Sequence, residues 1–339
     1  MLFRDTQRRP EAQRSRQNLP IENELKIKRI YQTEPIDATC WAYMRALRQF
    51  GATKKVYPED PYVEVYQLQA HVYGLLTENC DGMGDPWMYL IDGPKKAMLI
   101  DTGFGIGDLK ALCRILTGGK ELIVVNTHGH PDHAGGNAQF DKVYCHEYDV
   151  PALKQQEPGM WDYLFENGDR EKGRCIWSEF DRDDIISFLP YEIIGCPDGY
   201  RFDLGDGHQV ELVHMGGHTA GSCGFLDHGS GSLFTGDDLL SMRVGVGAAM
   251  PGTPYAEYMT VSTMRSAFER LSARKAEFQH VYPGHFATDL ENVTVDAMLE
   301  ACRAICADPE GNCTFRADSQ LLRAVDGLGT IAYTLQNIY

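Results

Sequence analysis

Short β-rich runs occur in two batches along the chain, and this arrangement constrains the fold more than any other feature. The first batch is "YVEVYQLQAHVYGLL", "PWMYLIDG", "KAMLIDTG" and "KELIVVNT", with a predicted helix over "IGDLKALCRIL". The second contains "HQVELVHM" and the predicted hairpin "SCGFLDHGSGSLFTGD", followed by helical patterns in "YAEYMTVSTMRSAFERLSA" and "NVTVDAMLEACRAICAD". Two batches of strands, each closed by helices, favour two mixed β-sheets packed face to face with helices outside.

Three segments lie outside this pattern. Residues 1–54 form a polar, helix-prone arm ending in "DATCWAYMRALRQFGA", whose spacing predicts one amphipathic helix. That helix has no neighbour within the arm, so we expect it to bury its apolar face on the body or on a partner subunit of a homodimer or higher oligomer. Residues 151–205 are an aromatic-bearing insert, and residues 311–339 are an apolar extension expected to pack on the main domain at 55–310.

Composition narrows the classes of partner. The 32 basic and 48 acidic residues leave a net charge of −16, which repels polyanions, so we expect no nucleic-acid partner. No stretch approaches the roughly eighteen apolar residues of a membrane span, and the arm lacks the apolar core of a secretory signal. We therefore expect a cytoplasmic protein whose scattered cysteines are reduced. Cys302, Cys306 and Cys313 are interpreted as apolar helix positions or, alternatively, as a zinc or redox site.

The stretch "NTHGHPDHAGGN" at 126–137 carries the strongest chemical signal, directly after the apolar run "ELIVV". His128 and His130 are two residues apart, so in extended backbone both side chains point the same way. Pro131 is typical of a helix start, which places Asp132 and His133 on its first turn. One segment thus offers two pairs of ligands in different directions, and this suits two metal ions. A polar helix cap with coincidental histidines is the alternative.

Further candidate ligands follow three other predicted strands. His218 lies in "MGGHTAGS", Asp237 in "LFTGDDLL" and His285 in "VYPGHF". Each adjoins glycine, which allows the backbone to approach a ligand closely. Neutral imidazoles and carboxylates are ligands that zinc, manganese and ferrous iron accept.

This set of motifs resembles the metallo-β-lactamase-fold hydrolase superfamily, in particular its glyoxalase II-like branch, over roughly residues 62–305. The resemblance implies an αβ/βα four-layer sandwich with two divalent metal ions at one edge, zinc foremost and manganese or iron as alternatives. It implies that the first ion is bound by His128, His130 and His218. It implies that the second is bound by Asp132, His133 and His285, with Asp237 bridging the two ions.

The expected chemistry is hydrolysis of a small carbonyl substrate: an ester, lactone, thioester, cyclic amide or cyclic ketone. Two cations that share a water lower its pKa from 15.7 toward about 7, so that a bridging hydroxide attacks the carbonyl. Asp237 would set the spacing of the ions. Asp132 would hydrogen-bond the hydroxide and later deliver its proton. We expect both aspartates to be catalytic.

Other residues are candidates for supporting roles. Asp101 and Thr219 are expected to orient ligand imidazoles, or else to serve plain turns. Arg243 follows the Asp237 strand and could pair with a substrate carboxylate, or else with the acidic surface. Tyr255 and Tyr258 are candidate hydrogen-bond donors to an oxyanion, with simple packing as the alternative. Two tryptophans of the insert are expected to form a lid or a small satellite core: Trp161 and Trp177.

Three other functions compete with hydrolysis. The same fold would support a mononuclear iron oxidoreductase of the persulfide-oxidising type. A nuclease is disfavoured by the net charge and by the absence of basic-aromatic clusters. A metal-binding scaffold would be expected to lose ligands, and none of the seven is missing.

Overall fold

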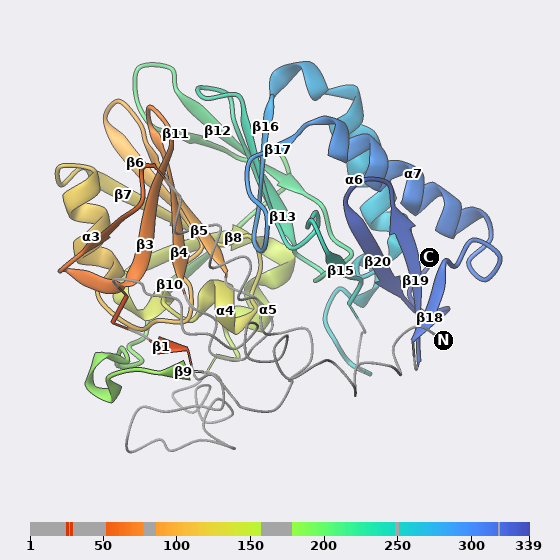
Figure 1. Cartoon of the computed structure of the whole chain (residues 1–339), viewed down its shortest axis with the longest axis horizontal. Helices are drawn as coiled ribbons and strands as arrows, with labels where there is room; N and C mark the ends of the chain where they lie inside the picture. Colours follow the sequence, from red (N-terminus) through yellow and green to blue (C-terminus); the bar gives the residue numbers. More distant parts are fainter. Residues whose placement is uncertain are drawn as a thin grey trace, which may run out of the picture.

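Two large β-sheets form the body of the protein (Figure 1). The computed structural model describes residues 25–26, 28–29, 52–77, 86–156, 178–247, 251–317 and 319–339. The first sheet has eight strands in the order β10-β8-β7-β6-β5-β4-β3-β2. Their bounds are β2 Lys55–Tyr57, β3 Asp60–Gln69, β4 Val72–Thr77, β5 Trp87–Asp92, β6 Lys96–Ile100, β7 Glu121–Val125, β8 Lys142–His146 and β10 Glu192–Cys196. Strands β2 to β6 are antiparallel neighbours, whereas β6, β7, β8 and β10 run parallel.

The second sheet has six strands in the order β11-β12-β13-β14-β16-β17. Their bounds are β11 Arg201–Asp203, β12 Gln209–His214, β13 Cys223–Asp227, β14 Ser232–Gly236, β16 His280–Pro283 and β17 Leu290–Glu291. Only β14 and β16 are parallel, and α6 (Val261–Ala273) lies between them in the chain. Thr260 caps α6 by accepting a hydrogen bond from the backbone N–H of Thr263.

The buried clusters show four layers. One cluster joins the facing sides of the two sheets, for example Ile91 and Val125 with Leu212 and Phe234. A second lies between the first sheet and α3 (Leu109–Leu116), and a third between the second sheet and the helices α6 and α7 (Val293–Ala307). The helices therefore cover the outer faces of a double sheet. The predicted αβ/βα sandwich is confirmed.

Residues assigned to the insert contribute to both sheets. β10 adds an edge strand to the first sheet beside β8, and β11 adds one to the second beside β12. The insert as drawn from the sequence, 151–205, was therefore too long at its C-terminal end. Its centre, with Trp161 and Trp177, lies outside the described residues, as does the predicted helix of the N-terminal arm. β1 (Lys28–Arg29) pairs with β9 (Ser178–Glu179).

The C-terminal residues build a third, smaller sheet in the order β15-β20-β19-β18. Its strands are β15 Arg243–Gly245, β18 Phe315–Ala317, β19 Gln320–Val325 and β20 Gly329–Tyr333. Ile331, Tyr333 and Ile338 are buried in the cluster that also holds α6 and α7. Cys302 and Cys306 are free thiols buried in this cluster, as expected of apolar helix positions.

The remaining helices are short. They are α4 Pro131–Ala134 and α5 Val150–Leu153, with 3-10 turns at Asn137–Gln139, Glu147–Asp149, Arg182–Asp184, Ala256–Tyr258 and Lys275–Glu277. Within the described residues, no helix has the length and apolar character needed to cross a membrane. The predicted ligands follow the ends of β7, β12, β14 and β16, so the two sheets bring them to one edge.

Candidate metal centre

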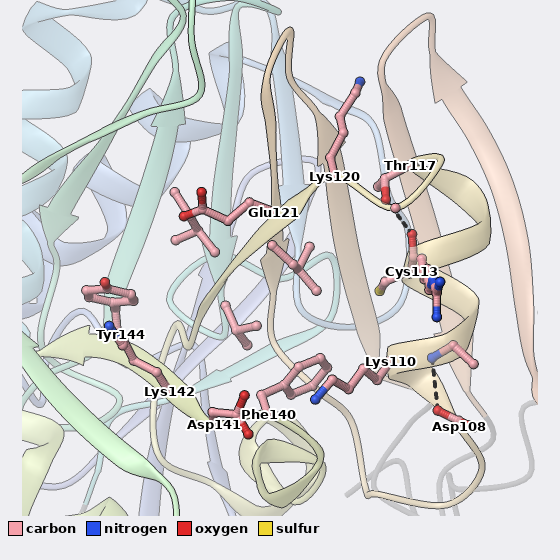
Figure 2. A pocket seen from close by; sticks show the side chains of 16 residues that line it. Asp108, Lys110, Cys113, Thr117, Lys120, Glu121, Phe140, Asp141, Lys142 and Tyr144 are labelled. Carbon is pink, nitrogen blue, oxygen red and sulfur yellow. Dashed lines mark hydrogen bonds between the residues drawn. The ribbon is translucent and has the colours of Figure 1, made fainter.

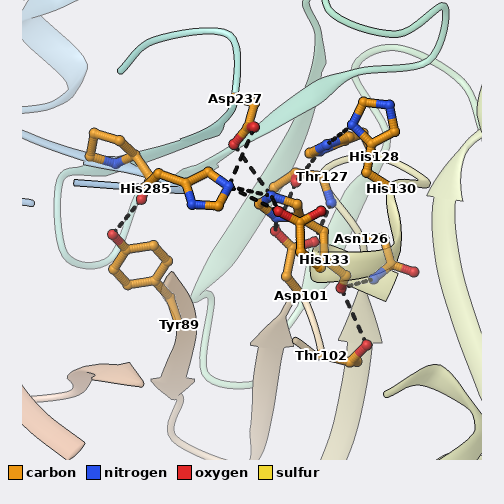
Figure 3. A network of polar contacts seen from close by, with 12 residues as sticks. Tyr89, Asp101, Thr102, Asn126, Thr127, His128, His130, His133, Asp237 and His285 are labelled. Carbon is orange, nitrogen blue, oxygen red and sulfur yellow. Dashed lines mark hydrogen bonds and ion pairs between the residues drawn. The ribbon is translucent and has the colours of Figure 1, made fainter. Parts of the chain in front are cut away.

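A buried polar network shapes the loop that follows β7 (Figure 3). The Asn126 N–H donates to Tyr144 O of β8, and Pro131 starts α4 after an extended His130. Thr102 Oγ1 and Asn126 Nδ2 both donate to the backbone carbonyl of His133, each at 3.2 Å. Asn137 Nδ2 in turn donates to Asn126 Oδ1 at 2.8 Å. These bonds turn the chain sharply after the strand and hold His133 in a fixed place.

The first predicted ligand group converges in space. His128 Nε2 and His218 Nε2 each lie 3.0 Å from Nδ1 of His130. His128 is buried and His218 partly buried, whereas His130 is exposed although its ring packs against the other two. The three ring nitrogens come from two loops that lie 88 residues apart in sequence at His130 and His218. Together they form a three-histidine group that could hold one metal ion.

Hydrogen bonds to the opposite ring nitrogens define the tautomers of two of these histidines. The Nδ1–H of His218 donates to Gly245 O at 2.7 Å. The Nδ1–H of His128 donates to Thr127 Oγ1 at 3.1 Å, because the Thr127 hydroxyl itself donates to Asp101. Both Nε2 atoms therefore present lone pairs toward His130 Nδ1. Such an arrangement is favourable when a cation lies between the nitrogens.

The second predicted group lies directly beside the first. His133 Nε2 lies 3.1 Å from His285 Nε2, and His285 Nε2 lies 3.2 Å from Asp132 Oδ2. Asp237 contacts both groups. Its Oδ1 is 3.3 Å from His133 Nε2, and its Oδ2 is 3.7 Å from His218 Nε2. The carboxylate is thus placed between the two sets of ligands.

The protonation states of two histidines and of both carboxylates fit a binder of divalent cations. Burial lowers the pKa of His128, and it lowers that of His130 to about 4, aided by neighbouring imidazoles, so both rings are neutral near pH 7. Burial alone would raise the pKa of Asp132 and Asp237, but His133 and His285 outweigh it and hold both values below the usual range. Neutral imidazoles and ionised carboxylates are the forms that bind metal. Among the described residues, the buried Oδ1 of Asp237 makes no hydrogen bond, so it can serve as a ligand.

The first sheet supports the loop that carries His285. Tyr89 Oη donates to Pro283 O at 2.6 Å (Figure 3). Trp87 Nε1 donates to Phe286 O at 3.0 Å. Gly284 lies so close to the centre that an added Cβ would meet Asp237 Oδ1 at 2.5 Å. Only glycine permits this approach. Residues from both sheets are therefore needed to place one ligand.

The structure places the two predicted supporting residues differently. Asp101 is buried, and its Oδ2 accepts the Nδ1–H of His133 at 2.9 Å, which leaves Nε2 free to face the metal site. Thr219 contacts no ligand ring among the described residues. Its hydroxyl donates instead to Asp149 Oδ2 at 3.0 Å. Asp101 therefore contacts a ligand imidazole directly, whereas Thr219 hydrogen-bonds Asp149.

The structure places the residues predicted to contact substrate in different surroundings. Arg243 is exposed, and its guanidinium donates to Gln320 of the C-terminal sheet, so it has no described contact with the ligand groups. Tyr255 and Tyr258 each stack on Tyr148, at ring distances of 4.5 and 4.4 Å. Tyr258 also accepts a backbone hydrogen bond from Gly217, the residue before His218. The two tyrosines thus belong to an aromatic stack behind the His218 turn.

Sequence reasoning missed several residues of the site. Asp149, Thr127 and Tyr148 are the main ones; Asp149 and Tyr148 lie outside the ligand motifs, and Thr127 lies inside the stretch 126–137. Thr127 had a signal, since it lies beside His128 and its side chain can hydrogen-bond the backbone locally. Asp149 follows "VYCHEY", where the only hint was its position after a strand.

A separate cavity of about 610 Å³ opens beside α3, where β7 and β8 diverge (Figure 2). The two strands share a single register pair, Val125 with Tyr144, which leaves the gap. Lys110, Arg114 and Phe140 are among its lining residues, and no predicted metal ligand is. The cavity is therefore not part of the metal centre.

Comparison with known proteins agrees with the fold and the ligand pattern. The family model described as the metallo-beta-lactamase superfamily matches residues 81–285, which is more than half of the chain. The matched segment holds all the predicted ligands from His128 to His285. The chain therefore belongs to the metallo-β-lactamase superfamily, a class of metal-binding hydrolases.

Its similar relatives carry hydrolase names. The chain is 27% identical over 220 residues to the acyl-coenzyme A thioesterase MBLAC2 of Bos taurus, covering 59% of this chain and 73% of that protein. It is 29% identical over 159 residues to the hydroxyacylglutathione hydrolase GloC of Haemophilus influenzae, covering 45% and 66% of the two chains. Among solved structures, the DIM-1 metallo-beta-lactamase matches with a TM-score of 0.50 at 17% identity, covering 72% of this chain and 99% of that chain. This last likeness concerns the fold alone.

Proposed function

We propose that the protein binds two divalent metal ions, with zinc as the expected metal, and hydrolyses the thioester bond of a small-molecule substrate. The observation that carries this proposal is the pair of adjoining ligand groups, both contacted by Asp237. The choice of a thioester among carbonyl substrates comes from the relatives. They are named as acyl-coenzyme A and ACP thioesterases and as hydroxyacylglutathione hydrolases, and each of these names denotes a thioester substrate.

The residues divide the chemical work between them. Two bound divalent ions would lower the pKa of a shared water toward about 7 and polarise a carbonyl group. His128, His130 and His218 would hold one ion, and Asp132, His133 and His285 the other. Asp237 would hold both, because its Oδ1 lies 3.3 Å from His133 Nε2 of one group and its Oδ2 lies 3.7 Å from His218 Nε2 of the other. The pKa of Asp132 lies below its usual range, so its carboxylate stays ionised. It would therefore orient the attacking water by accepting a hydrogen bond from it.

The carboxylates also act on the second pair of histidines. His133 and His285 are buried beside Asp132 and Asp237, which raise the pKa values of both imidazoles despite the opposing effect of burial. A cation bound to this group would take the place of the protons on these rings, because only the neutral imidazole binds metal. The net charge of −16 on the whole chain disfavours binding of a nucleic acid, which supports a small-molecule substrate.

The test combines metal analysis with a substrate panel. Wild-type protein reconstituted with zinc should bind two ions per chain and release free thiol from at least one acyl-coenzyme A or acylglutathione. His218→Ala should lose one ion and several orders of magnitude in kcat/KM. His71→Ala is the matched histidine control, because His71 is exposed in the turn between β3 and β4.

Two results would overturn the proposal. One is metal content well below two ions per chain together with no hydrolysis of any thioester, ester or lactone. The other is oxygen consumption by iron-loaded protein without hydrolysis, which would identify the oxidoreductase alternative instead.

A further inference from the structure

Asp149 joins the two loops that carry the three-histidine group, and we infer that it is a positioning residue for the metal ion held there. The side chain is buried at the end of a 3-10 turn, Glu147–Asp149, which follows β8. It is not one of the seven predicted ligands. The inference rests on the metal-binding part of the proposed function and deepens it.

Both oxygens of the carboxylate are used. Oδ2 accepts the backbone N–H of Gly129 at 2.8 Å and the hydroxyl of Thr219 at 3.0 Å. Oδ1 accepts the backbone N–H of Gly221 at 2.8 Å. Gly129 lies between His128 and His130, whereas Thr219 directly follows His218. One carboxylate therefore bonds both ligand loops: at Gly129, which adjoins two of the histidines, and at Thr219 and Gly221, one and three residues after His218.

The donors can be assigned without ambiguity. Thr219 N donates to Ser222 Oγ at 2.9 Å, and the two hydroxyls lie 2.8 Å apart. Because the Thr219 hydroxyl gives its hydrogen to Asp149, the Ser222 hydroxyl must donate to Thr219 Oγ1. The chain of bonds ends on a group that accepts only, which is what an ionised carboxylate provides and an amide does not.

Close packing shows that this contact is built into both loops. A Cβ added to Gly221 would meet the backbone nitrogen of Asp149 at 2.4 Å. The backbone of the His218 turn therefore comes directly against Asp149. The loops are also joined by one backbone bond, from Cys223 N to Thr127 O at 2.9 Å, which lies closer to the sheet. The Asp149 carboxylate joins the same two loops nearer to the ligand histidines than that backbone bond does.

Loss of the carboxylate should loosen the three-histidine group selectively. In Asp149→Asn, the amide nitrogen must face at least one of the three donors. The loops then separate or the amide stays unsatisfied. Partners that orient ligands in this way typically contribute 10- to 100-fold in metal affinity. We expect a loss of this size at the three-histidine group and no comparable loss at the group containing His133.

The experiment measures metal binding and does not depend on turnover. Apo protein is titrated with Co²⁺ in the presence of a competing chelator, and the visible spectrum follows each of the two sites. Asp227→Asn is the matched control. Asp227 is also a buried carboxylate with three donors, from His208, Gly229 and Ser230, but it lies at the opposite end of β13 from Cys223.

A second pair of variants keeps the test informative if Asp149→Asn does not fold. Thr219→Val removes one donor to Asp149, and Thr219→Ser retains it. The expected order of Co²⁺ affinity at the three-histidine group is wild type and Thr219→Ser first, then Thr219→Val, with Asp149→Asn weakest. Asp227→Asn should lower thermal stability but leave both affinities unchanged.

The outcomes separate this inference from the proposed function. Wild-type affinity at both sites in Asp149→Asn, or equal affinities in Thr219→Val and Thr219→Ser, would overturn the positioning role. An equal loss at both sites would overturn it as well, because it would indicate general loosening. If wild-type protein itself bound no second ion, the proposed dinuclear function would fail, whereas the comparison at the three-histidine group would still stand.

Discussion

Asp101→Asn is the perturbation whose effect the structure defines most sharply. Asp101 accepts three hydrogen bonds: from Thr127 N at 2.7 Å, from Thr127 Oγ1 at 2.8 Å and from His133 Nδ1 at 2.9 Å. Its backbone has a φ of 64°, a left-handed conformation that asparagine tolerates well. The substitution therefore changes the hydrogen-bonding pattern with little disturbance of the chain.

The amide cannot satisfy all three donors. If its oxygen faces His133, its NH₂ group meets the backbone N–H of Thr127. If its NH₂ group faces His133, the imidazole must accept at Nδ1 and carry its proton at Nε2, the atom that faces His285 and Asp132. A charge-assisted hydrogen bond of this kind is worth about 1.5–3 kcal/mol. That range corresponds to roughly a 10- to 150-fold loss of affinity for the second ion.

Competition between the protein and a chelator for zinc measures this effect directly. We expect two binding steps in wild-type protein and a selective weakening of one step in Asp101→Asn, with kcat falling in parallel. Asp203→Asn serves as control, because Asp203 is exposed and, within the described part of the chain, its side chain accepts a single hydrogen bond, from the backbone N–H of Gly205. Wild-type affinity for both ions in Asp101→Asn would refute the reasoning that Asp101 sets the tautomer of His133.

Three further outcomes follow from the structure. Asn337→Ala removes the donor to Val246 O and Gly247 O and should weaken zinc binding at the three-histidine group by up to about ten-fold, read by the same competition assay. The bond to Asp227 raises the pKa of His208 in the folded protein. The stabilisation from this bond is therefore complete below about pH 6.5 and is lost as the pH rises through the higher folded pKa. The melting temperature of His208→Gln should differ more from that of wild type near pH 6 than near pH 9. Arg243→Ala should change KM less than about ten-fold, because its exposed guanidinium already bonds Gln320; a larger rise in KM on an acidic substrate would restore the predicted substrate contact.

The sequence carried enough information to predict the layers and the ligand motifs, for a physical reason. Alternating and continuous apolar runs mark strands, and the ends of neighbouring strands meet at one edge of a sheet. His218, Asp237 and His285 each follow such a run, so they were visible as candidates before any distance was known. The spacing of the residues around His128 also predicted two sets of ligands that point in different directions, and the structure has two adjoining ligand groups there.

The contacts that position those ligands are long-range, and no local pattern encodes them. Asp149 meets Gly221 across 72 residues, and Asp101 meets His133 across 32. Thr219 was interpreted from its place beside a ligand, but its hydroxyl points to a carboxylate that spacing could not connect with it. The edge strands β10 and β11 were missed because they are only five and three residues long, too short for a clear apolar pattern, so their pairing depends on the sheets already formed.

The turn that carries His218 needs external support from two sides. Gly216 and Gly217 both have positive φ values, so the residues before the ligand have little intrinsic stiffness. On one side the Asp149 carboxylate holds Thr219 and Gly221. On the other side the carbonyl of Gly245 accepts the Nδ1–H of His218, and β15, which contains Gly245, pairs with β20 of the C-terminal sheet. Because β20 lies beyond the segment 81–285 that matches the family model, the superfamily core of this chain depends on its C-terminal residues to orient one of its ligands.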